Sequence, residues 1–93
     1  MSEHQESVRD LSVLVSESVT HEELQSVIAK GQFVRDVALA DLYRGTGIAP
    51  GKKSVTYTLT LGAPDRTLTS EEIDASLRGI GESLQVRCAA ELR

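Results

Sequence analysis

The sequence predicts an α+β domain whose strands and helices follow one another in the order βαββαβ. Three segments alternate apolar and polar side chains with the two-residue period of a strand buried on one side. Two further segments carry apolar side chains at helical spacing, and each opens with a Thr followed three residues later by a Glu. A chain of 93 residues has room for one domain with one modest core.

The first predicted strand spans residues 8–16. The side chains expected on its buried face are Leu11, Val13 and Val15. Residues 1–7 are polar and acidic and show no periodicity, so we expect a disordered lead-in there and a domain over residues 8–93. This lead-in does not resemble a signal peptide, and no apolar run approaches the roughly 20 residues that span a membrane.

The first predicted helix begins after Thr20, which with Glu23 forms a capping-box pattern. Gly31 marks its end. Its apolar stripe consists of Leu24, Val27 and Ile28.

The second and third predicted strands span residues 33–43 and 54–61, joined by a loop over residues 44–53 that is rich in Gly. Strict alternation divides the second strand into one face with Ala38, Ala40 and Leu42 and another with Leu39, Asp41 and Tyr43. In the third strand, the side chains expected to face inward are Val55, Tyr57, Leu59 and Leu61.

A second capping box, formed by Thr69 and Glu72, opens the next predicted helix. Its apolar stripe is Ile73, Leu77, Ile80 and Leu84. Residues 89–93 can form one short closing strand. Elements in this order predict the ferredoxin-like fold, a four-stranded antiparallel sheet with two helices on one face, which leaves the other face open to solvent or to a partner.

The open face is expected to carry a small group of functional side chains. Because side chains two residues apart share a face, Asp41 and Tyr43 point together, and a hairpin brings Ser54 close to them. An aromatic ring, a carboxylate and a hydroxyl suit an unstacked RNA base, which stacks on the ring and bonds through its Watson–Crick edge. The flanking cations, which could contact phosphates, are Arg44, Lys52 and Lys53.

Each of these residues also has an ordinary structural interpretation. The Tyr could be a cross-strand packing residue, the Asp a solvated carboxylate, and the basic residues simple loop charges. Because the formal net charge is −4, any affinity for RNA must come from a local patch of the surface.

At these residues the sequence resembles a known family, the C-terminal ferredoxin-fold anticodon-binding domain of the bacterial phenylalanyl-tRNA synthetase beta subunit. Five motifs carry the resemblance, in the order and with the gaps of that family. They are Arg9-Asp10-Leu11-Ser12, Asp41-Leu42-Tyr43-Arg44-Gly45, Gly51-Lys52-Lys53-Ser54, Asp65-Arg66-Thr67-Leu68-Thr69 with Glu71-Glu72, and Ala90-Glu91-Leu92-Arg93.

The resemblance implies a domain that grips the anticodon of phenylalanine tRNA and catalyses nothing by itself. Tyr43 falls at the position where the family stacks the first anticodon base, a guanine. Asp41 and Ser54 fall at the positions where the family forms hydrogen bonds with that base. The implied partners are this tRNA and the remainder of the synthetase, its alpha and beta subunits, in the cytoplasm and without a membrane. The domain itself would need no cofactor, whereas the parent enzyme would use ATP and Mg. We expect the upstream beta-subunit domains to be absent from this chain.

Three positions depart from the family pattern. Ala40, Leu61 and Cys88 stand where members often have Phe, and we expect all three to be buried or nearly so. These departures keep open an alternative, an excised or engineered ferredoxin-like scaffold or interaction domain that does not bind RNA.

A small enzyme on the same fold, such as an acylphosphatase, fits poorly. That chemistry needs a positioned Asn, and the sequence contains no Asn. The one cysteine excludes an internal disulfide, and no cluster of Cys or carboxylate residues pairs with His4 or His21 at metal-ligand spacing.

Overall fold

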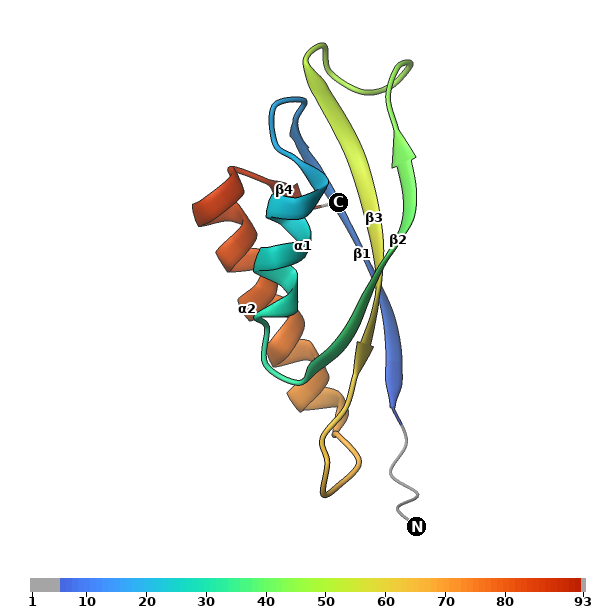
Figure 1. Cartoon of the computed structure of the whole chain (residues 1–93), viewed down its shortest axis with the longest axis vertical. Helices are drawn as coiled ribbons and strands as arrows, with labels where there is room; N and C mark the ends of the chain where they lie inside the picture. Colours follow the sequence, from blue (N-terminus) through green and yellow to red (C-terminus); the bar gives the residue numbers. More distant parts are fainter. Residues whose placement is uncertain (1–5, 93) are drawn as a thin grey trace.

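The structure of the protein is a computed structural model that describes residues 6–92 (Figure 1). Its elements follow the predicted order. They are β1 (Ser7–Ser16), α1 (His21–Ala29), β2 (Val34–Tyr43), β3 (Lys52–Leu61), α2 (Ser70–Cys88) and β4 (Glu91–Leu92).

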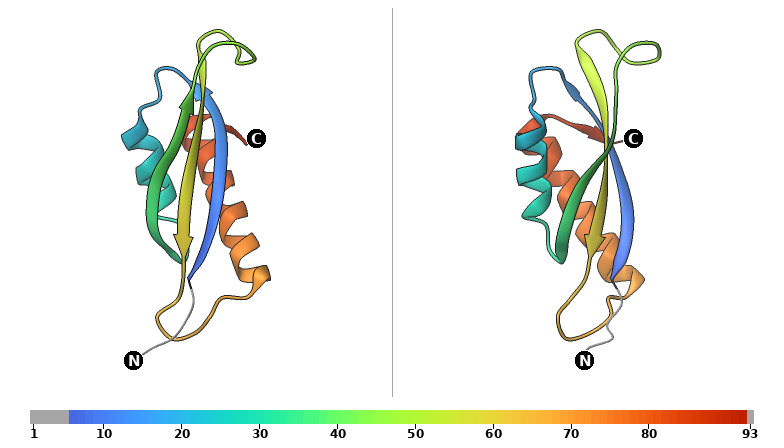
Figure 2. Two further views of the ribbon diagram at one scale, coloured as in Figure 1. Left: turned by 90° about the vertical axis from the view of Figure 1, so that its right-hand side faces the viewer. Right: turned by 45° about the vertical axis from the view of Figure 1, so that its right-hand side comes forward.

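The four strands form one antiparallel sheet in the order β2-β3-β1-β4. Both helices cover the same side of the sheet, and the side that faces the viewer on the left of Figure 2 has no helix over it. The predicted ferredoxin-like α+β fold is therefore confirmed, including the open sheet face.

Two strands begin earlier than the sequence pattern predicted. β1 already includes Ser7, whereas the rest of the lead-in predicted over residues 1–7 lies, apart from Glu6, outside the described residues. β3 begins at Lys52, which with Lys53 was assigned to the loop. These two lysines pair with Ser16 and Val15 of β1, so the backbone ladder continues past the polar-to-apolar change in the sequence.

The core lies between the helices and the buried face of the sheet. Val55, Tyr57, Leu59 and Leu61 all face inward, as predicted from their alternation. The main cluster joins β1, β3, α1 and α2, and a smaller one at the start of α2 contains Leu61, Ala63, Leu68 and Ile73. The helical stripe is also confirmed, since Ile73, Ile80 and Leu84 are buried and Leu77 packs beside them.

Both helices begin at the predicted caps. The Thr20 hydroxyl accepts a hydrogen bond from Glu23 N at 3.1 Å in α1. In α2, Thr69 Oγ1 accepts from Glu72 N at 3.1 Å while the Glu72 carboxylate accepts from Thr69 N at 2.9 Å, so the capping box is complete.

The alternation predicted for β2 is wrong in its middle part. The pairing of β2 with β3 shifts by one residue between Leu39 and Asp41, so Ala40 is an extra, unpaired residue in a β-bulge. Residues that face each other across a strand pair share a side of the sheet. Leu39 opposite Tyr57 therefore lies on the helix side, and Ala38 opposite Thr58 lies on the open side, each the reverse of its predicted position.

The bulge also corrects one expectation about buried positions. Ala40 is exposed, so a small side chain there leaves no cavity in the core. Leu61 and Cys88, the other two positions where a Phe is common, are buried as expected. They belong to different core clusters and are accommodated by separate neighbours.

Candidate nucleic-acid interface

A row of four side chains crosses the open face at one end of the sheet. Tyr43 of β2 lies opposite Ser54 of β3, Ser54 lies opposite Leu14 of β1, and Leu14 lies opposite Glu91 of β4. Directly paired residues share a face, and neighbouring strands are about 5 Å apart. The row therefore runs across the whole sheet, with a phenol at one end and a carboxylate at the other.

Tyr43 presents much of its ring to solvent, with 45% of the residue exposed. Its hydroxyl donates a hydrogen bond to the carbonyl oxygen of Thr46, at 2.7 Å, in the loop that follows β2. The phenol is thus tied to the loop and not to a helix, and its orientation is fixed before any ligand arrives.

Asp41 lies on the same face, one row along, opposite Thr56 of β3. Its side chain is exposed. Thr56 in turn shares a hydrogen bond of 2.8 Å with the hydroxyl of Ser12 on β1. A carboxylate and a line of hydroxyl groups therefore lie on the same face as the Tyr43 ring. The carboxylate can accept hydrogen bonds from the edge of a planar base, and the hydroxyl groups can accept or donate them.

Ser54 is on the predicted side of the sheet, but it is not as open as the other two residues. Only 7% of it is exposed. Its short side chain lies in the row between the larger side chains of Tyr43 and Leu14. The Ser54 hydroxyl is therefore recessed among its neighbours and does not project from the sheet as the Tyr43 ring does.

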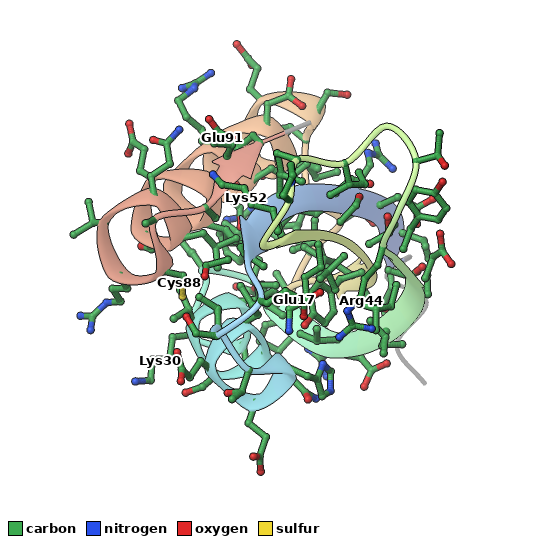
Figure 3. All side chains as sticks on the ribbon, turned by 90° about the horizontal axis from the view of Figure 1, so that it is seen from above. Glu17, Lys30, Arg44, Lys52, Cys88 and Glu91 are labelled. Atoms are coloured by element: carbon green, nitrogen blue, oxygen red, sulfur yellow. The ribbon has the colours of Figure 1, made fainter. Side chains whose placement is uncertain are left out.

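The three predicted phosphate-contacting cations are not equivalent. Lys52 lies two residues before Ser54 in β3 and therefore points to the same open face. Its Nζ lies 3.6 Å from Glu91 Oε2. Arg44 Nε donates a hydrogen bond of 2.5 Å to Glu17 Oε2 at the end of β1. Figure 3 shows both pairs, with each cation directed toward its carboxylate.

Lys53 is the residue that the sequence placed incorrectly. It pairs with Val15 of β1 and lies two residues before the buried Val55, so its side chain points to the helix side of the sheet. It is 7% exposed, and its ammonium group donates to the Glu17 carbonyl oxygen at 3.5 Å. Its place is explained by the earlier start of β3, because a lysine in the strand must follow the strand's alternation.

Sequence analysis missed Leu14, Glu17 and Glu91. Leu14 joins the row through its pairing with Ser54 of β3, and Glu91 joins it through the pairing of β4 with β1. Glu17 contacts both ends of the β2–β3 loop and the start of β3. Its N–H donates to Gly51 O at 2.8 Å, its carbonyl oxygen accepts from Lys53, and its carboxylate accepts from Arg44. The alternation of side chains in β1 could have placed Leu14 on the open face, away from the buried Val13. The positions of Glu17 and Glu91 depend on tertiary contacts.

Other chemistry receives no support from the side chains that the structure describes. Across residues 6–92, no group of three or more His, Cys, Asp or Glu side chains is arranged to hold a metal ion. None of the helices in the same range combines the length and apolar character of a membrane span.

The fold and the open face together define a class of protein, a small ferredoxin-like domain that offers a helix-free sheet surface with an exposed aromatic ring and acceptor groups. Comparison of the sequence with known families agrees with this class. A family model described as "Ferredoxin-fold anticodon binding domain" matches residues 2–93. The chain belongs to this family.

Several curated relatives share the description phenylalanine–tRNA ligase beta subunit. The protein from Chromobacterium violaceum is 38% identical over 95 aligned residues, which cover 100% of this chain and 12% of the relative. The protein from Halalkalibacterium halodurans is 41% identical over 87 residues, covering 91% of this chain and 11% of the relative. The chain thus spans about a tenth of the length of the relatives it matches. These findings support the RNA-related interpretation over the scaffold alternative.

Proposed function

We propose that this domain binds the anticodon loop of phenylalanine tRNA on its open sheet face. The observation that carries the proposal is the row in which Tyr43 lies opposite Ser54, with Asp41 two residues along the same strand and on the same side. The description of the family and the names of the relatives support the choice of ligand.

The chemistry of the site favours a guanine as the base that is bound. A base stacked on the Tyr43 ring can direct its edge along the sheet toward the exposed Asp41, whose Cα lies about 7 Å from that of Tyr43 along β2. Guanine presents two adjacent N–H donors on its Watson–Crick edge, and a carboxylate can accept both. Adenine would place a ring nitrogen acceptor against the carboxylate, which leaves that acceptor unpaired.

We propose that this domain positions the tRNA while another part of a longer enzyme performs the reaction. We propose that the partners of this domain are phenylalanine tRNA and the alpha and beta subunits of a cytoplasmic synthetase. The aminoacylation chemistry, with ATP and Mg, belongs to that larger enzyme, and the domain needs no cofactor of its own. Lys52 and Arg44 would contact phosphates, whereas the buried Lys53 would help to hold the loop.

The proposal is tested by titrating the chain with an anticodon stem-loop carrying GAA and following backbone and side-chain chemical shifts. Shifts should concentrate on Asp41, Tyr43 and Ser54. Tyr43→Ala should weaken binding by about 1–3 kcal/mol, the value of one base–aromatic stack. Leu42→Ala is the matched control, because Leu42 is 41% exposed but pairs with Val55 on the helix side.

Replacing the first anticodon base by adenine should weaken binding of the unchanged protein and have less effect on Asp41→Asn. Equal binding of both stem-loops by the unchanged protein, or equal losses for Tyr43→Ala and Leu42→Ala, would rule out the proposed site.

A further inference from the structure

Lys52 and Glu91 meet on the open face although their strands are not neighbours in the sheet. Lys52 begins β3 and Glu91 begins β4, with β1 between them. The ammonium nitrogen lies 3.6 Å from the Glu91 carboxylate, so the pair bridges over β1 (Figure 3). Glu91 is in the same cross-strand row as Ser54 and Tyr43, so this pair borders the proposed base site.

Lys52 is the predicted cation that the register places on the same face as Tyr43. In the free domain its charge is already compensated, because Glu91 supplies an anionic oxygen. An RNA phosphate offers the same kind of acceptor to the same ammonium group. The Lys52 and Glu91 side chains are 36% and 64% exposed, and exposed ion pairs are weakly held, so exchange of one anion for the other is feasible.

We propose that Glu91 is an internal counter-ion that competes with an RNA phosphate for Lys52 and so lowers the affinity of the domain for RNA. This inference rests on the proposed function. When a base settles on Tyr43, the neighbouring phosphate displaces the Glu91 carboxylate, and the carboxylate returns to water. The overall negative charge of the chain, −4, adds to the same effect but acts at every point on the surface.

The test measures binding of a GAA anticodon stem-loop to the whole chain by fluorescence anisotropy at several salt concentrations. Glu91→Gln should tighten binding about two- to fivefold at low salt, which corresponds to the value of one exposed ion pair. The gain should shrink as salt rises, because salt screens both the pair and its competitor. Glu71→Gln, an equal charge change in the first turn of α2, should leave the affinity unchanged.

A second comparison separates competition for Lys52 from a general change in charge. In a Lys52→Met background, Glu91→Gln should no longer improve binding. An equal gain in both backgrounds would overturn the inference, and so would the absence of any gain in a protein whose binding still depends on Tyr43. Failure of every variant to bind the stem-loop would instead overturn the proposed function and this inference with it.

Discussion

Gly31, just after α1, packs so closely against Ile80 of α2 that a β-carbon on residue 31 would overlap the Ile80 side chain. Ile80 is buried in the main core cluster and has little room to move. The glycine was predicted as a helix stop. Its structural role is to let the end of one helix approach the middle of the other.

Gly31→Ala should therefore destabilise the domain by about 1–3 kcal/mol, the usual cost of inserting a methyl group into a packed core. The matched control is Gly79→Ala, because a β-carbon at this helical glycine meets nothing within 4 Å. That change should stabilise the domain by about 0.5–1 kcal/mol through helix propensity. Denaturant unfolding of both variants checks the prediction, and equal effects would contradict the proposed contact.

The capping box of α2 should make stability depend on pH. Hydrogen bonds from the Arg66 side chain and from Thr69 N lower the pKa of Glu72 from its ordinary value of 4.5 to about 2. A lowered carboxyl pKa means that stability is present above pH 4.5 and is lost as the pH falls toward about 2.

Glu72→Gln should keep the cap but remove this dependence, since Gln can still accept the bond from the Thr69 N–H. The melting temperature of the variant should lie below that of the unchanged protein near neutral pH and approach it as the pH falls. A difference between the two that stays constant down to pH 2 would contradict the assignment.

The buried phenol of Tyr57 should affect stability at alkaline pH. Burial, with a smaller effect from the nearby Cys88 thiol, raises the pKa of Tyr57 from 10.0 to about 12. A raised phenol pKa favours folding below pH 10, and this contribution is lost as the pH rises toward about 12. Tyr57→Phe should therefore reduce the alkaline loss of stability.

The same variant removes the hydrogen bond between Tyr57 Oη and His21 Nδ1, at 2.9 Å, which should cost about 0.5–1.5 kcal/mol near neutral pH. Spectroscopic titration of His21→Ala is the companion measurement. The phenol should still titrate late, because burial and not the imidazole is the main cause of its shift. An ordinary Tyr57 titration in that variant would contradict this cause.

Ala40 and Leu61, two positions where family members often have Phe, should differ in how substitution changes the free energy of unfolding. Leu61→Ala empties a fully buried position in the smaller core cluster and should cost about 2–5 kcal/mol. Ala40→Phe adds a ring at an exposed bulge and should change the unfolding free energy by no more than about 0.5 kcal/mol. Thermal unfolding of both variants tests whether residue 40 lies outside the core.

The features that sequence predicted well depend on neighbouring residues. Both Thr caps, the apolar stripes of the helices and the alternation of β3 are local patterns, and each appears in the structure. The geometric relation of Asp41, Tyr43 and Ser54 could also be predicted, because these residues lie on the same side of the bulge and parity between them is intact.

The features that sequence missed depend on contacts between distant elements. Leu39 was placed on the wrong face because nothing in the local pattern marks Ala40 as unpaired. Lys53 was assigned to the loop because a strand that pairs with β1 can continue through polar residues. The ion pairs of Arg44 with Glu17 and of Lys52 with Glu91 require the folded sheet, since their partners are far apart in the chain.

The bulge at Ala40 has a consequence for how this surface can vary. It separates a part of β2 in which Val37 and Leu39 face the helices from a part that presents Asp41 and Tyr43 to the open side. Residue 40 itself is unpaired in the register of β2 with β3, and its side chain is exposed. Different side chains at this one position can therefore reshape the margin of the binding surface while the fold and the recognition residues stay in place.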